Sequence, residues 1–372
     1  MEVSTNLSVE VSYKKQFLLG VLLLLVIIIA IEGIVRTYDY FNPNCMFISS
    51  EVFQDIDFEL KRAICHANDD IIWSDQPFLH LLPNQHVPTV NINSDGFRGP
   101  EITKDKSENV YRIFVVGGST TFGVGATSDL TTIPGFLQKK FQDANLNFKV
   151  EVINAGIPKA YSFTETYYIK NILLEYDPDL FIIYDGWNDI NRPYDVFDDT
   201  TDYQSSEKIL RMILKNDIYK TGKVILKNYF NWRANENIIF DSTDIDKKVD
   251  TWRNNWSEIC KTDYGNRFDV IMVLQPLVGT GNKVLTEEEQ TYYKHADHYN
   301  LLQYYEKYAF ALDELNSQCT KTKDMREIFD DMKITMYFDA GHTGDEGNRI
   351  IAEVLYETSK PIIEKRFYSF DN

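Results

Sequence analysis

Four short apolar runs along the chain have the length and β-branched character of buried β-strands. They cover residues 111–116, 148–154, 180–184 and 270–274. Helices are predicted over residues 133–145, 164–175 and 286–315, and a last helix begins within 347–356. Short apolar strands that alternate with helices are typical of a parallel sheet covered on both faces, so the pattern predicts an α/β fold.

A longer apolar run over residues 17–35 stands apart from these strands, and Glu32 is its only charged residue. A helix of this length just spans a bilayer core of roughly 30 Å. A cleavable signal peptide is the competing interpretation, but its apolar region is usually shorter and no small-x-small cleavage site follows Ile31. We therefore favour an uncleaved transmembrane anchor, in which Glu32 forms an i,i+4 ion pair with Arg36.

The charges around this run indicate an orientation. Lys14 and Lys15 precede it and Arg36 follows it, so the excess of positive charge favours a short cytoplasmic N-terminus. We expect a single-pass membrane protein whose large remainder lies outside the cytoplasm. The formal net charge of -18 argues against nucleic acid as a partner, because binding to phosphates needs clustered Lys and Arg.

These features divide the chain into four segments: a tail at 1–16, the anchor at 17–35, a juxtamembrane segment at 36–109 and the α/β domain at 110–366. An insertion at about 191–265, with predicted helices over 206–228 and 245–260, interrupts the domain near the edge where open α/β sheets bind ligands. It is either a lid or a packing element. In the juxtamembrane segment, the stretch from Asn93 to Glu101 predicts a structured turn.

The four cysteines show no C-x-x-C spacing, which argues against a zinc knuckle or a redox motif. Sequence order suggests the pairs Cys45–Cys65 and Cys260–Cys319. Two other pairings exist, and free buried cysteines are an alternative. We expect neither a cofactor nor a metal.

The stretch Gly117-Gly118-Ser119-Thr120-Thr121-Phe122-Gly123 directly follows the strand over 111–116. Glycines permit the backbone angles and the close approach that a sharp turn at the end of a buried strand requires. Such a turn lifts the Ser119 hydroxyl out of the sheet, as an exposed nucleophile requires. A turn in which Ser119 merely caps the next helix explains the same residues, so other motifs must decide.

Three further motifs lie at the ends of predicted strands or before the last helix: Asn154-Ala155-Gly156, Gly186-Trp187-Asn188-Asp189 and Asp339-Ala340-Gly341-His342. Together with the serine turn they resemble the four blocks of the SGNH hydrolase superfamily, also called GDSL esterases/lipases, over residues 110–360. Gly118 departs from the many members that have Asp at this position. The resemblance implies a three-layer, flavodoxin-like α/β/α sandwich with a mainly parallel sheet.

The resemblance also implies a role for each matched residue in ester chemistry. Ser119 would be the nucleophile, His342 its base and later the acid for the leaving alcohol, and Asp339 the group that orients the imidazole. The backbone N–H groups of Ser119 and Gly156 and the side-chain amide of Asn188 would bind the oxyanion.

The sequence therefore predicts a membrane-anchored serine esterase that hydrolyses an O-acyl ester through an acyl-enzyme on Ser119. Its substrate would be a small-molecule, lipid or glycan ester. One alternative is an acyltransferase that acts on a surface glycan through the same acyl-enzyme. Another is a catalytically silent binding module that keeps the fold. The oligomeric state is left open by the sequence.

Overall fold

A computed structural model describes most of the chain: residues 12–41, 45, 49–71, 81–144, 146–190, 221, 222, 225, 245–261, 267–294 and 296–369. Apart from residues 221, 222 and 225, the predicted helix over 206–228 lies outside the described residues. The chain divides into two compact units, one formed by residues 1–44 with 201–238 and the other by residues 45–200 with 239–372.

The first unit contains helix α1 (Tyr13–Phe41), which is long and apolar enough to cross a membrane. A signal sequence near the N-terminus can meet the same criteria of length and composition. The predicted ion pair is confirmed, because Arg36 Nε lies 2.7 Å from Glu32 Oε1. The other carboxylate oxygen of Glu32 accepts hydrogen bonds from the backbone N–H and the hydroxyl of Thr221, both at 2.9 Å.

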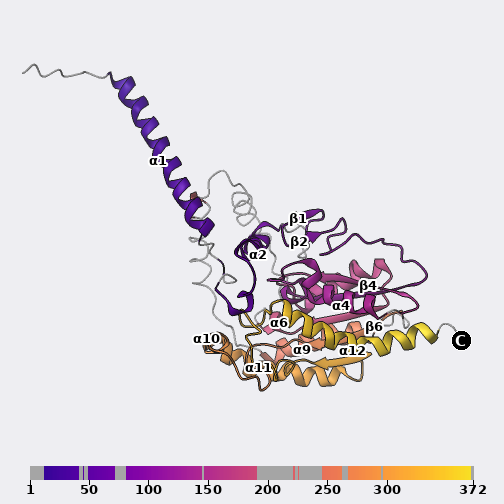
Figure 1. The fold of residues 1–372 in the computed structure, drawn as a ribbon. Coiled ribbons are helices and arrows are strands. Elements are labelled where there is room, and N and C mark those ends of the chain that lie inside the picture. Colours follow the sequence, from indigo (N-terminus) through magenta and orange to yellow (C-terminus); the bar gives the residue numbers. More distant parts are fainter. Residues whose placement is uncertain are drawn as a thin grey trace, which may run out of the picture. The chain divides into compact units, whose positions relative to one another are not determined.

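The second unit contains a five-stranded sheet in the order β4-β3-β5-β6-β7, in which all neighbouring strands are parallel. The predicted α/β fold class is thereby confirmed. The strands are β3 (Val110–Gly117), β4 (Lys149–Gly156), β5 (Leu180–Asp185), β6 (Asp269–Leu274) and β7 (Lys321–Asp324). Figure 1 labels β4 and β6 of this sheet.

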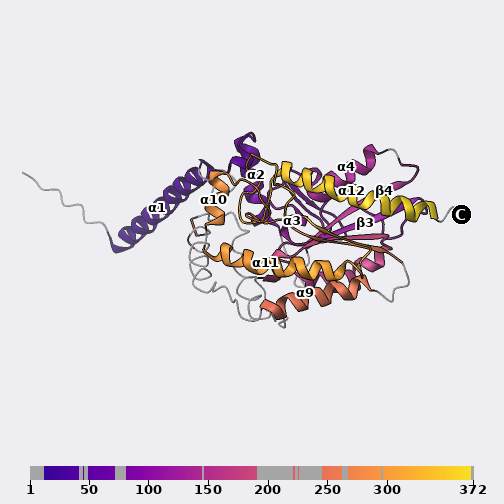
Figure 2. The same ribbon diagram turned by 90° about the horizontal axis from the view of Figure 1, so that it is seen from below.

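Helices cover both faces of the sheet (Figure 2). On one face α4 (Ile133–Asp143) packs against α12 (Asp345–Ser369), and on the other α9 (Ile245–Cys260) packs against α11 (Ala296–Leu315) and α5 (Ser162–Asn171). Successive residues of β3 alternate between the two layers, as a pleated strand requires. Ile113 and Val115 join the cluster under α4 and α12, while Phe114 and Val116 join the cluster under α9 and α11.

Two predicted helices differ from the observed ones. The helix predicted over 286–315 is two helices, α10 (Glu287–Tyr293) and α11, and Thr286 opens α10 with a capping box that uses Glu289. The helix predicted over 164–175 is α5 followed by a short 3-10 helix, η4 (Leu173–Tyr176). Asp177 ends it in the left-handed region, with φ of 50°.

Strand β7 was missed because it has no apolar signal, its sequence being Lys-Thr-Lys-Asp. Among the described strands it lies at the edge of the sheet, where it pairs with β6, and edge strands of natural proteins commonly carry lysine. A polar edge strand shows no alternation, so the periodicity of the sequence does not reveal it.

The juxtamembrane segment contributes structure to the second unit. It forms the short 3-10 helix η2 (Glu51–Phe53), helix α2 (Phe58–Asp70) and an antiparallel hairpin of β1 (Gln85–Val87) and β2 (Val90–Ile92). Phe53 and Ile64 pack with Phe338 in one buried cluster. Val90 and Ile92 pack with Phe122 in another. This segment therefore belongs to the same core as the residues that surround the serine turn.

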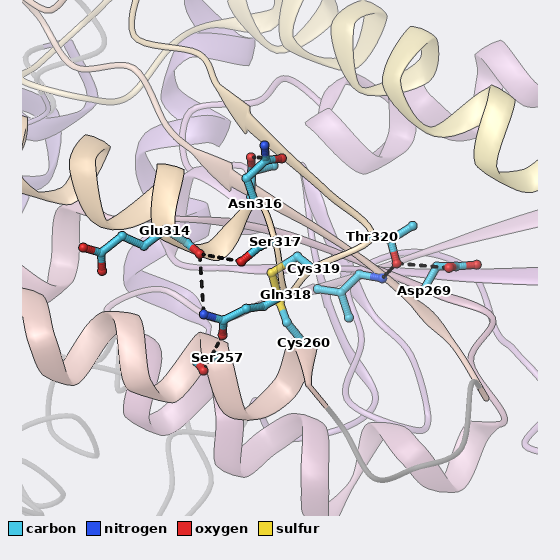
Figure 3. Close-up of a disulfide and its surroundings, with 11 residues drawn as sticks. Ser257, Cys260, Asp269, Glu314, Asn316, Ser317, Gln318, Cys319 and Thr320 are labelled. Atoms are coloured by element: carbon cyan, nitrogen blue, oxygen red, sulfur yellow. Dashed lines mark hydrogen bonds between the residues drawn. A yellow bond between two sulfur atoms is a disulfide. The ribbon is translucent and has the colours of Figure 1, made fainter.

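Two disulfides join Cys45 to Cys65 and Cys260 to Cys319. The second links the end of α9 to the connection between α11 and β7 (Figure 3). Around it, Ser257 donates to the side chain of Gln318 at 2.5 Å, and Thr320 donates to Asp269 at 3.0 Å. The bond thus fixes the entry to the edge strand.

Replacing both Cys260 and Cys319 by Ala is expected to lower the free energy of unfolding by about 2–4 kcal/mol, because the unfolded chain loses a cross-link that restricts it. Chemical denaturation of the full chain in detergent measures this. The Cys45–Cys65 disulfide closes a shorter loop, with a sequence separation of 20 rather than 59, so replacing both of these cysteines by Ala is expected to cost about 1 kcal/mol less. Equal unfolding free energies for the Cys260/Cys319 variant and the unmodified protein would contradict the prediction.

Candidate active site

The serine turn lies at the C-terminal edge of the sheet, where β3 ends at Gly117. Ser119 is the first residue of the one-turn helix α3 (Ser119–Phe122), and Gly123 ends this helix in the left-handed region with φ of 93°. A Cβ atom at Gly117 would lie 2.4 Å from the carbonyl oxygen of Tyr184 on β5. The glycine therefore lets the strand and the turn approach β5 closely, and Ser119 is left partly exposed.

The structure brings the predicted triad together. The Nε2 atom of His342 lies 2.7 Å from Ser119 Oγ, and its Nδ1 atom lies 2.7 Å from Asp339 Oδ2. The second oxygen of Asp339 accepts the backbone N–H groups of Gly341 at 2.9 Å and of His342 at 2.7 Å. One carboxylate thus shapes the turn that carries His342 and also orients its ring.

The charge of Asp339 follows from these contacts. Burial alone would raise its pKa, but attraction to a charged His342 and the hydrogen bonds from the ring and the two backbone N–H groups hold the pKa below its ordinary value. An ionised Asp339 only accepts hydrogen bonds, so Nδ1 of His342 carries the proton. When the ring is neutral, Nε2 then presents a lone pair to Ser119.

Aromatic rings fix the plane of His342. The ring of Trp187 lies 5.2 Å from it, centroid to centroid, and that of Phe338 is stacked at 5.7 Å. Phe338 in turn packs on Phe53 at 5.3 Å. A Cβ atom at Gly341 would lie 2.3 Å from the Trp187 ring, so this glycine permits the close packing. The juxtamembrane segment therefore backs the ring that stacks on the candidate base.

Asn188 lies beside the serine turn, on the short helix α6 (Trp187–Ile190) that follows β5. Its side-chain amide donates to the carbonyl of Ala160 at 2.6 Å. A Cβ atom at Gly118 would lie 2.4 Å from the same nitrogen, so the absence of a side chain at Gly118 leaves room for Asn188. A carboxamide nitrogen carries two hydrogens, and the bond to Ala160 uses one of them.

Gly156 ends β4 on the other side of α3. Its backbone N–H donates to the side-chain oxygen of Asn154 at 3.0 Å. A Cβ atom at Gly156 would lie 2.2 Å from the backbone nitrogen of Phe122, so the glycine lets α3 pack directly on β4. The single N–H of Gly156, one of the predicted oxyanion donors, therefore already has a protein acceptor.

Buried carboxyl groups behind Asn188 are a feature that the sequence analysis missed. Asp189 accepts the backbone N–H of Ser162 at 3.0 Å and also the Ser162 hydroxyl. Asp185 accepts the indole N–H groups of Trp252 at 3.0 Å and Trp256 at 3.2 Å. The sequence offered one signal, because Asp189 belongs to the Gly186-Trp187-Asn188-Asp189 motif. The sequence does not reveal, however, that both carboxyl groups are buried.

Burial raises the pKa of each of these carboxyl groups. It raises the pKa of Asp185 to about 6, although hydrogen bonds from Gly186, Trp252 and Trp256 oppose the rise. Burial and the charge of Asp185 raise the pKa of Asp189. For Glu165 on α5, burial acts first and the charges of Asp185 and Asp189 add to it. Neither oxygen of Glu165 has a hydrogen-bond partner among the described residues.

The chain is similar in structure to several solved esterases and lipases. An acetyl xylan esterase, AlAXEase, is 14% identical with a TM-score of 0.40 and covers 66% of this chain and 98% of its own. A lipase/acylhydrolase from Enterococcus faecalis is 13% identical with a TM-score of 0.40 and covers 68% and 96%. The acetylxylan esterase Axe2 from Geobacillus stearothermophilus is 13% identical with a TM-score of 0.39 and covers 66% and 93%. No protein-family model and no curated protein matches the chain.

Glu165→Gln is expected to stabilise the protein increasingly as the pH rises. The raised folded-state pKa of Glu165 makes its ionisation unfavourable in the folded protein, so stability falls with pH above the unfolded-state pKa of about 4.3. The advantage of the glutamine variant should grow by about 1.4 kcal/mol per pH unit until the folded-state pKa is passed.

Denaturation of the full chain at pH 5 and pH 8 measures this difference. Glu108→Gln, at an exposed position, is the matched control and should show no such trend. A Glu165→Gln variant that loses stability equally at both pH values would contradict the prediction.

Proposed function

We propose that this protein is a serine esterase that hydrolyses an O-acyl ester through an acyl-enzyme on Ser119. The observation that carries the proposal is the continuous hydrogen-bonded chain from Ser119 Oγ through both nitrogens of His342 to Asp339, with both distances at 2.7 Å. A serine hydroxyl is a weak nucleophile until an adjacent base takes its proton, and this chain supplies such a base.

In the first half-reaction, Nε2 of His342 removes the hydroxyl proton while Ser119 Oγ attacks the ester carbonyl. The carbonyl oxygen gains the negative charge, and the ionised Asp339 stabilises the imidazolium that forms. The carbon–oxygen bond to the alcohol then breaks, and the leaving oxygen takes the proton from Nε2. The products are free alcohol and an acyl group on Ser119.

In the second half-reaction, water takes the place of the alcohol. Nε2 of His342 removes a proton from the water, whose oxygen attacks the acyl carbonyl. The bond to Ser119 breaks and its oxygen recovers the proton, which releases the carboxylic acid and restores the hydroxyl. Each half-reaction passes through one oxyanion, so the same donors serve both.

We propose the backbone N–H of Ser119 and the second amide hydrogen of Asn188 as the principal oxyanion donors. The contact between Asn188 and the Gly118 position supports this choice. A contribution from Gly156 requires its N–H to exchange the side chain of Asn154 for the oxyanion, so we assign it the smaller share.

We further propose that α1 anchors the protein in a membrane and that the site lies outside the cytoplasm. The apolar length of α1 and the lysines before it support the anchor and the orientation. Two disulfides support an oxidising compartment, because such bonds persist there. Small-molecule, lipid and glycan esters are the substrate classes that meet such a site.

Ser119→Ala is expected to lower kcat for ester hydrolysis by at least about 10³-fold, because it removes the nucleophile. A panel of short and long acyl esters, together with labelling by a fluorophosphonate, measures this on the full chain. Ser317→Ala, at an exposed serine of the same protein, is the control and should retain both activities. Undiminished hydrolysis by Ser119→Ala would contradict the proposal, and no labelling of the folded unmodified protein would contradict it in favour of a silent binding module.

Asn188→Ala is expected to lower kcat by about 10²–10³-fold with a smaller change in KM, because the amide binds charge that develops only in the transition state. Steady-state kinetics on the best ester of the panel measure this. Asn171→Ala removes a similar amide-to-carbonyl bond, to Tyr167, at the exposed end of α5 and should leave kcat unchanged. An Asn188 variant with the kcat of the Asn171 control would show that Asn188 only caps a helix.

A further inference from the structure

The turn between Asn93 and Glu101 delivers an arginine into the interior of the second unit. The side-chain oxygen of Asn93 accepts the backbone N–H groups of Asp95 at 3.0 Å and Phe97 at 2.9 Å, and its amide donates to the carbonyl of Pro100 at 2.8 Å. Arg98 follows Phe97, and its backbone forms isolated antiparallel β-bridges with Ile92 and with Asn154. Its side chain is only 1% exposed.

All three nitrogens of the Arg98 guanidinium donate hydrogen bonds, and Nη1 does so to the end of the nucleophile-bearing helix. Nη1 donates to the carbonyls of Phe122 at 3.0 Å and Gly123 at 2.8 Å. Nη2 donates to the carbonyl of Thr89, and Nε to Asp129 Oδ1, both at 2.8 Å. The guanidinium also lies over the Phe122 ring, 4.9 Å from its centroid.

These contacts matter because α3 is a single turn. A helix of this length is not stable alone, since nucleation is costly and the last carbonyls have no partner within the helix. Arg98 supplies donors to the Phe122 and Gly123 carbonyls, and Asn154 supplies a second donor to Phe122 at 3.1 Å. A positive charge at a helix C-terminus also interacts favourably with the helix dipole.

We propose that Arg98 is a positioning residue for the nucleophile. It holds the C-terminal end of α3, so that Ser119 at the other end of the same turn stays within reach of His342. This inference deepens the proposed esterase function and rests on it. Asp129 acts with Arg98, because its Oδ1 atom accepts the guanidinium Nε–H. The two oxygens of Asp129 also accept the backbone N–H of Asn91, at 3.3 Å for Oδ1 and 3.2 Å for Oδ2.

The chain contains a matched control in Arg112. Its side chain is also 1% exposed, and it also binds one carboxylate, that of Glu151 at 2.8 Å. It too donates to three backbone carbonyls, those of Thr103, Lys104 and Tyr176. Arg112 lies near the N-terminal end of β3, however, whereas Ser119 follows the C-terminal end. The two arginines are equally buried and make similar hydrogen bonds. They differ in that Arg98 binds the end of α3, whereas Arg112 lies at the far end of β3 from Ser119.

The experiment compares Arg98→Lys with Arg112→Lys in the full chain in detergent. Both should lower Tm, because lysine cannot replace all the bonds of a buried guanidinium. We expect Arg98→Lys alone to lower kcat and the second-order rate of fluorophosphonate labelling, by about 10–100-fold, because a small misplacement of a reacting group costs that much. KM should change much less, and Arg112→Lys should keep the labelling rate of the unmodified protein. Folded Arg98→Lys that is labelled as fast as Arg112→Lys would overturn the proposal.

A second variant and a second readout keep the test decisive. If Arg98→Lys does not fold, Asp129→Asn removes the negative charge that pairs with the Arg98 guanidinium. A reduced labelling rate of this variant supports the proposal, and an unchanged rate overturns it. Hydrogen exchange of the Phe122 and Gly123 amides, which bond to Gly118 and Ser119, should be faster in Arg98→Lys or Asp129→Asn than in Arg112→Lys. If the folded unmodified protein is not labelled, the proposed function fails, and exchange alone decides whether Arg98 holds α3.

Discussion

The hydrogen bond between His342 Nε2 and Ser119 Oγ is the contact on which the candidate site depends, and it joins residues 223 positions apart. A parallel sheet makes this possible because its strands all end at one edge. The register that places Gly117 opposite both Gly156 and Tyr184 brings the serine turn level with the segments that follow β4 and β5. Any shift of that register would move Asn188 and the serine turn apart.

The second constraint is that the reacting groups stand on short, weak elements. Ser119 and Asn188 each belong to a helix of one turn. His342 belongs to a loop that is closed by a hydrogen bond from the Phe338 N–H to the His342 carbonyl. Such elements take their order from neighbours rather than from their own helix formation. The neighbours include Phe53 behind Phe338, and Val90 and Ile92 behind Phe122. The segment between the apolar helix and the sheet is therefore structural support for the site.

Much of the fold was predictable from the sequence because its signals are local. Buried parallel strands are continuous apolar runs, and the Ser119, Asn188 and Asp339–His342 motifs are recognisable by spacing. The missed features depend on tertiary context. Polar β7 is a strand only because β6 offers it an edge, and α10 ends at Tyr293 with no glycine or proline to signal the break before α11. The burial of Arg98 arises only when the segment after the hairpin meets β4, where Arg98 bridges to Ile92 and to Asn154.

The need to hold weak elements in place also explains why buried carboxyl groups, which lower the stability of the fold, lie so close to the site. A donor that stabilises a transition state must be held in place before the reaction, and a dry, hydrogen-bonded setting holds it most firmly. Asp189 ties the helix that carries Asn188 to Ser162, next to the turn whose Ala160 carbonyl accepts the Asn188 amide. Asp185 is held in turn by Trp252 and Trp256. Burying these carboxyl groups together with Glu165 lowers the free energy of unfolding at neutral pH. The hydrogen bonds of Asp189, however, help to fix the direction of the Asn188 amide.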